Sequence, residues 1–183
     1  NAKVDTLTIA GTTDLDVTGN FETVTTILTG IADVNVKGNL TATDFTAESN
    51  LTLTVKGDAT AETLTVVKDL QAEVKNLVIN EKLDVDGNAV ITAAENITAK
   101  TVEIAGTANI TAVDAIVETM TVGADATIQV TTMDVTAADI SGNAIITAET
   151  AIVDTLTIDG TANITADTAI IGTLTVDGVA DIQ

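Results

Sequence analysis

Aliphatic and polar residues alternate along most of the chain, and the alternation itself repeats at a fixed interval. Between Thr155 and Ile182 an aliphatic residue recurs every six positions, and the segment Thr155–Gly160 returns eighteen residues later as Thr173–Gly178. Strict alternation is the period of a β-strand with one buried face. Three six-residue sides per repeat therefore predict short strands that coil into stacked turns. The six-residue series comprises Ile158, Ile164, Ile170, Val176 and Ile182.

The repeat extends over the whole chain and can be followed from one marker position, most often Gly, in each turn. Regular internal repeats of this length are typical of solenoids. The sequence predicts an all-β, three-sided parallel β-helix of about nine to ten turns. Residues 1–183 would form a single β-solenoid domain, with 19-residue turns to about Gly106 and 18-residue turns after it. The markers are Gly11, Gly30, Ser49, Lys68, Gly87, Gly106, Ala124, Gly142, Gly160 and Gly178.

The inward-facing positions can be assigned relative to these markers. Positions two before and two, four and six after each marker are almost always aliphatic or Ala. We expect the extra residue of each 19-residue turn on the third side, between its inward column and the next marker, as a small bulge or wider corner. Gly, Asn and Asp at the markers suggest corners with unusual backbone angles. The column ten after the marker, interrupted at Asp134, comprises Phe21, Leu40, Ala59, Val78, Ile97, Ile116, Ile152 and Ile170.

The handedness of the coil follows from two considerations. Hexapeptide-repeat acyltransferases form left-handed β-helices and prefer a small residue directly after the aliphatic one. Here that place holds larger residues such as Thr111, Val117 and Gln129. Parallel crossovers are right-handed by default, so we predict a right-handed coil.

The segments Ile97–Ile110 and Leu83–Gly87 have a cadence that resembles bactofilins, and the resemblance in rhythm covers most of the chain. Bactofilins are polymer-forming bacterial proteins with a right-handed, three-sided β-helix of similar turn length. The resemblance implies rods that join end to end into filaments without a nucleotide. The Thr-rich sides of this chain are more typical of secreted surface solenoids.

Charge limits the partners of the protein. The net charge is −20, which disfavours nucleic acid and anionic membranes, since both attract basic surfaces. No stretch is long and apolar enough to insert into a membrane. All seven Lys residues lie in residues 1–100 together with fifteen acids, whereas residues 101–183 hold twelve acids and no basic residue. Only two residues are aromatic, Phe21 and Phe45, which suits the thin core of a solenoid.

Candidate catalytic chemistry is sparse in this composition. The absence of His and Cys excludes the common catalytic triads and zinc sites, so we predict no enzyme and no catalytic, cofactor-binding or metal-binding residues. Carboxylates in adjacent turns, Asp159 with Asp177 and Glu149 with Asp167, would repel each other unless cations screen them. Screening by Ca²⁺ is the one cofactor role that the sequence suggests.

One side carries exposed Thr-x-Thr pairs, which resemble the flat Thr arrays of insect ice-binding proteins. Thr is also simply a favourable residue on an exposed strand. The pairs include Thr6 with Thr8, Thr63 with Thr65, Thr119 with Thr121, Thr155 with Thr157, and Thr173 with Thr175. The rows are interrupted by Asp44, Lys82, Asp84, Glu103, Ala137 and Asp139.

The ends of the sequence show no capping segment, so we expect an uncapped solenoid or part of a longer repeat. Open β-strand edges can pair with another chain. We therefore expect a non-enzymatic structural protein that assembles with itself, end to end, into an extracellular or cell-surface filament, fibre or layer. The alternatives are an adhesin stalk or passenger segment, an ice-binding protein and a cytoplasmic filament.

Overall fold

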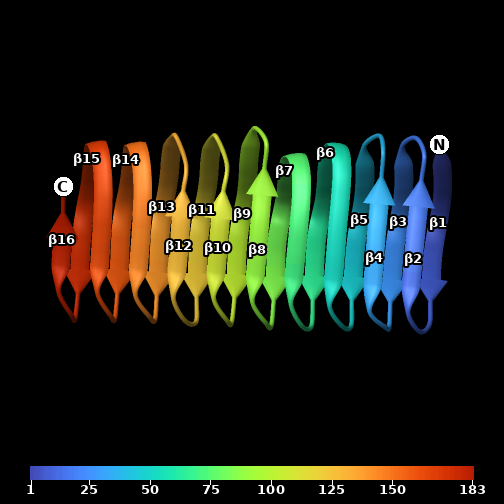
Figure 1. Cartoon of the computed structure of the whole chain (residues 1–183), viewed down its shortest axis with the longest axis horizontal. Coiled ribbons are helices and arrows are strands. Elements are labelled where there is room, and N and C mark those ends of the chain that lie inside the picture. The colour runs from blue at the N-terminus through green and yellow to red at the C-terminus, as the bar shows by residue number, and fades with distance from the viewer.

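The computed structural model describes residues 1–183 and contains strands but no helix. All strands belong to one sixteen-stranded sheet, which winds into a solenoid of about ten turns (Figure 1). The strands are β1 (Ala2–Ile9), β2 (Thr13–Val17), β3 (Phe21–Leu28), β4 (Ala32–Val36), β5 (Leu40–Ala47), β6 (Leu51–Val66), β7 (Leu70–Val85), β8 (Ala89–Ala93), β9 (Asn96–Ile104), β10 (Ala108–Thr111), β11 (Asp114–Val122), β12 (Ala126–Gln129), β13 (Thr132–Ile140), β14 (Ala144–Ile158), β15 (Ala162–Val176) and β16 (Ala180–Ile182).

Every strand pairs in parallel with its equivalent in the next turn. Phe21 of β3 pairs with Leu40 of β5, nineteen residues later, whereas Ala115 of β11 pairs with Met133 of β13, eighteen residues later. These registers confirm the parallel solenoid and its change of turn length. In Figure 1 the near strands β2, β4 and β8 run upward, the far strands run downward, and the turns advance from right to left. This path is a right-handed coil.

Each turn has three sides, which we number by their relation to the marker. The first side leads to the marker, the second side follows it, and the third side follows the second. In β3 the third and first sides form one strand that bends at Val24 and Thr25, where the alternation of buried and exposed residues changes phase. We call the join of the second and third sides the second corner.

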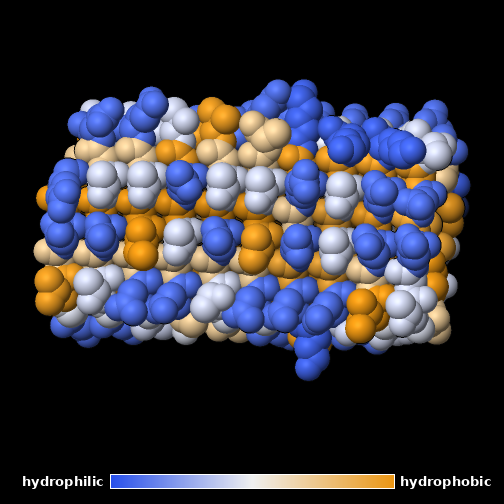
Figure 2. All heavy atoms as spheres, viewed as in Figure 1, coloured by the Kyte–Doolittle hydropathy of each residue, from blue (hydrophilic) through white to orange (hydrophobic).

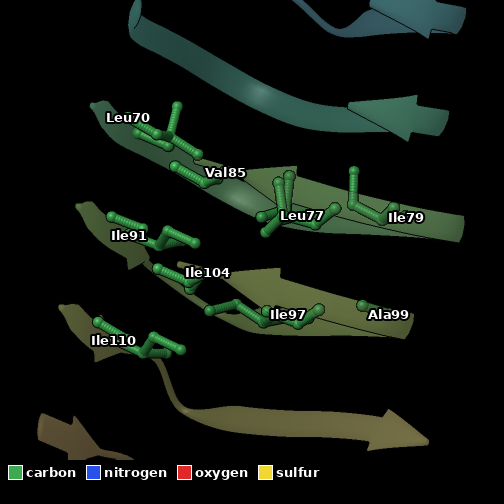
Figure 3. Packing of buried hydrophobic residues seen from close by; sticks show 14 of the residues in the cluster. Leu70, Leu77, Ile79, Val85, Ile91, Ile97, Ala99, Ile104 and Ile110 are labelled. Atoms are coloured by element: carbon green, nitrogen blue, oxygen red, sulfur yellow. The ribbon is translucent and has the colours of Figure 1, made fainter. Parts of the chain in front are cut away.

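The interior is a single cluster of 53 buried apolar residues. Columns on the first and second sides follow the prediction: Ile110, Ile128 and Ile146 stack in register, and each is at most 3% exposed. Figure 3 shows the same stacking for Ile91 on Ile110 and for Leu77 on Ile97. Because short strands cannot bury an apolar face alone, the stack itself makes the core.

The predicted column of the third side is wrong at four positions. Ile116 and Ile170 are 49% and 57% exposed, and Val78 and Ile152 are only half-buried. The inward residues of these turns stand one position earlier. In this register Asp134 interrupts nothing, because it lies in the outward row between Ile116 and Ile152. The four inward residues are Leu77, Ala115, Ala151 and Ala169, with Met133 in the turn of Asp134.

The extra residue of the 19-residue turns also lies elsewhere than expected. It lengthens the second corner, where three residues separate Val17 from Phe21 but only two separate Val130 from Met133. One turn follows the expectation. In β7 the second corner is short, and the register shift after Ile79 places the extra residue before Leu83.

Most marker corners have ordinary backbone angles. Gly11, with a φ of 89°, is the one residue of the chain with positive φ. Small residues at the markers instead allow close stacking, since a Cβ on Gly30 would lie 2.2 Å from the carbonyl oxygen of Gly11. The expectation of unusual angles therefore holds only at Gly11, and at the other markers the spacing between turns explains the glycines.

Candidate functional site

Asn and Asp side chains link successive turns at two corners. At the second corner, the Oδ1 atom of Asn20 accepts a hydrogen bond from the backbone N–H of Asn39 at 3.0 Å, and Oδ1 of Asn39 accepts one from Asp58 at 3.1 Å. At the marker corner, Oδ1 of Asn88 accepts the N–H of Thr107 at 2.9 Å. These ladders satisfy corner N–H groups outside the strands. These ladders were not predicted from the sequence, although the nineteen-residue spacing of Asn20 and Asn39 was a signal.

We expect Asn88→Ala to lower the free energy of unfolding by about 1–2 kcal/mol, because several hydrogen bonds of modest net value are lost. Asn88 accepts both the N–H and the hydroxyl of Thr107, and its amide donates to Asp69. Urea unfolding followed by circular dichroism measures the change. Asn109→Ala is the matched control, since Asn109 is exposed and makes no side-chain hydrogen bond. Equal costs for the two variants would contradict a stabilising role for the ladder.

The Thr-x-Thr pairs lie on the first side, but they do not form a continuous array. The register places Lys82, Asp84 and Glu103 in the same two rows. Lys82 Nζ lies 2.9 Å from Asp84 and 2.7 Å from Glu103, so an ion-pair cluster divides the face. The hydrogen bonds to Glu103 and then Asp84 raise the pKa of Lys82. Pairs in directly adjacent turns occur only at the end of the chain, where Thr155 and Thr157 stack on Thr173 and Thr175.

The carboxylate pairs lie in adjacent turns as the sequence indicated. Ala148 pairs with Ala166 and Ile158 pairs with Val176, which places Glu149 beside Asp167 and Asp159 beside Asp177. No group of three or more acidic side chains is arranged to hold a metal ion. The pairs therefore provide negative charge along two corners without a formed metal centre.

Four of the seven lysines form ion pairs, each with a carboxylate. Besides Lys82, Lys3 pairs with Glu22, Lys100 with Glu81 at 2.9 Å, and Lys75 with Glu95 at 3.5 Å. Hydrogen bonds to Glu22 and Glu81 raise the pKa of Lys3 and Lys100, respectively. The remaining lysines, Lys37, Lys56 and Lys68, have no such partner, although the chain holds 27 acids.

The geometry defines a parallel β-solenoid rod whose surface consists of rows of like positions. Figure 2 shows these rows on one face, where hydrophilic groups predominate and single hydrophobic residues are scattered among them. Comparisons of the chain with protein-family models, curated proteins and solved structures found no match. The likeness to bactofilins thus stays a resemblance in rhythm. The structure has no helix that is long and apolar enough to cross a membrane.

Proposed function

We propose that the protein is a structural rod that assembles end to end with further copies of itself, without catalysis. The observation that supports this most is the uniformity of the ladder. Consecutive turns pair like with like, as Leu156 with Leu174 and Ile158 with Val176. A turn of one copy can therefore pair with a turn of another copy through the same columns.

The first and last turns of these 183 residues fit such a junction. Leu7 and Ile9 in β1 occupy the same columns as Leu174 and Val176 in β15, and all four are only partly buried. Their strand edges carry N–H and C=O groups that can continue the ladder. Stacking would bury leucine on leucine and isoleucine on valine, in the register used inside the rod.

We propose an extracellular or cell-surface filament, fibre or layer. The Thr-rich sides suit a solvated outer surface. The net charge of −20 opposes nonspecific lateral aggregation, and cations such as Ca²⁺ would screen paired carboxylates like Glu149 and Asp167. A stalk that only spaces a binding tip would use the same rod without assembly.

Electron microscopy of the purified chain in negative stain tests the proposal, with and without millimolar Ca²⁺. We expect long filaments of uniform width. Leu174→Glu should abolish them by placing a carboxylate in the junction column, whereas Thr175→Glu, which points outward on the same strand, should not. Separate rods about 45 Å long in every condition would overturn end-to-end assembly and favour the stalk.

A further inference from the structure

The second corner carries opposite charges toward the two ends of the rod. Its N-terminal turns present lysines and its C-terminal turns present acids, with Ala94 and Val113 exposed between them. The second-side strands point to the upper edge in Figure 1, and that edge in Figure 2 is hydrophilic toward both ends with a hydrophobic group between. We call this row the charged edge. In chain order it comprises Lys37, Lys56, Lys75, Ala94, Val113, Thr131, Glu149 and Asp167.

Two of the three lysines at the basic end of the charged edge have no ion-pair partner within the molecule. Val36 pairs with Val55 and Val55 with Val74, which stacks Lys37, Lys56 and Lys75 in adjacent turns. Only Lys75 has an ion-pair partner. Adjacent strands are about 4.8 Å apart, so the like charges repel one another. An acidic surface placed against Lys37 and Lys56 would relieve that repulsion.

The acidic end has the complementary deficit. Glu149 and Asp167 stack in adjacent turns, both are exposed, and residues 101–183 contain no basic residue to neutralise them. The protein therefore has one edge with unpaired positive charge at one end and unpaired negative charge at the other.

When one copy of the charged edge is turned end over end against another, the lysines of each copy face the acids of the other. We propose that two copies of this chain associate side by side and antiparallel along the charged edge, about a two-fold axis between the turns of Ala94 and Val113. Lys37 then faces Asp167 of the second copy, and Lys56 faces its Glu149. In a two-fold interface each contact occurs twice, so four ion pairs form. The apolar Val113 faces Ala94 near the axis.

Parallel lateral arrangements satisfy fewer charges. Parallel copies in register would place Lys56 against Lys56 and Glu149 against Glu149. A parallel stagger by six turns would match two lysines with two acids, but less than half of each rod would overlap and the contact would propagate without closing. Only the antiparallel dimer uses the whole charged edge and closes. It is independent of the end-to-end junction, which involves different residues.

Complementary charge reversals test the pairing in the Leu174→Glu background, which removes end-to-end assembly. Variant A carries Lys37→Glu and Lys56→Glu, and variant B carries Glu149→Lys and Asp167→Lys. We expect sedimentation equilibrium at low salt to show a dimer for the parent chain. Each variant alone should dissociate at least about tenfold more readily, because like charges then face each other at all four contacts. An equimolar mixture of A and B should form a heterodimer, and all four substitutions in one chain should restore the homodimer.

Charge-matched controls separate this edge from the general effect of net charge. Lys68→Glu with Lys100→Glu matches variant A, and Asp159→Lys with Asp177→Lys matches variant B, at positions outside the charged edge. Both controls should dimerise like the parent chain, and circular dichroism should show that all variants stay folded. A monomeric parent at low salt, equal loss in the controls, no rescue in the mixture, or an open series of larger particles would each overturn the antiparallel dimer.

Discussion

An aspartate in place of Ile128 will unfold the rod around its seventh turn and divide its unfolding into two transitions. Ile128 is 1% exposed and lies between Ile110 and Ile146 in a column of the second side. A carboxylate there has no partner and loses its water, which costs about 3–5 kcal/mol or more. Since each turn of a solenoid contacts only its neighbours, the defect will uncouple the turns on either side.

Urea unfolding followed by circular dichroism, with hydrogen exchange to locate the weakened turns, measures this effect. Thr127→Asp is the matched control, because it adds the same charge on the same strand but on the outward face. Surface changes of this kind alter stability by less than about 0.5 kcal/mol. If Thr127→Asp were the more destabilising variant, the register of β12 would be wrong by one residue, since a shift of one exchanges the two faces.

Most of the fold was predictable from the sequence, because the alternation of inward and outward residues keeps a constant phase relative to the 18- or 19-residue repeat on the first and second sides. Alternation identifies the inward residues, and the 18- or 19-residue repeat identifies which of them stack. The column of Ile110, Ile128 and Ile146 confirms both inferences. Right-handed winding followed from the general preference of parallel crossovers.

The third side could not be predicted from hydropathy, because the length of the preceding corner sets its phase. When the second corner has two residues rather than three, the inward position moves one place earlier. Ala115 and Ala151 then point inward while the more hydrophobic Ile116 and Ile152 point outward. The anomalous Asp134 was the signal of this shift, since a carboxylate in an interior column would be costly.

The candidate surfaces were visible in the sequence only as spacing. Lys37, Lys56 and Lys75 are nineteen residues apart, so their stacking follows from the repeat. The sequence could not show which of these three lysines forms an ion pair with a carboxylate. The structure shows that Lys75 has Glu95 within 3.5 Å whereas Lys37 and Lys56 have no carboxylate partner, and this difference depends on side-chain reach at each corner.

Phe45→Ala should be the most destabilising truncation of an inward side chain in the first three turns. Phe45 is 1% exposed and lies between Thr26 and Leu64 in its column. The inward neighbours before and after it in β5, Ala42 and Ala47, are small, so the ring supplies most of the inward side-chain volume between Ala42 and Ala47. Removal of a buried Phe side chain costs about 3–5 kcal/mol when the surroundings cannot close on the space.

Urea unfolding of Phe45→Ala tests whether the surrounding side chains and strands move into the space that the ring leaves. Backbone hydrogen bonds fix the spacing of the turns, and a small apolar cavity already lies beside Phe45, so little collapse is expected. Phe45→Leu, which keeps most of the volume, should cost less than about 1.5 kcal/mol in the same urea titration. Val24→Ala, at a position that is 51% exposed, should be nearly neutral. A cost below about 1 kcal/mol for Phe45→Ala would mean that the third and first sides move inward to fill the space. The backbone hydrogen bonds between turns would then not fix the width of the core.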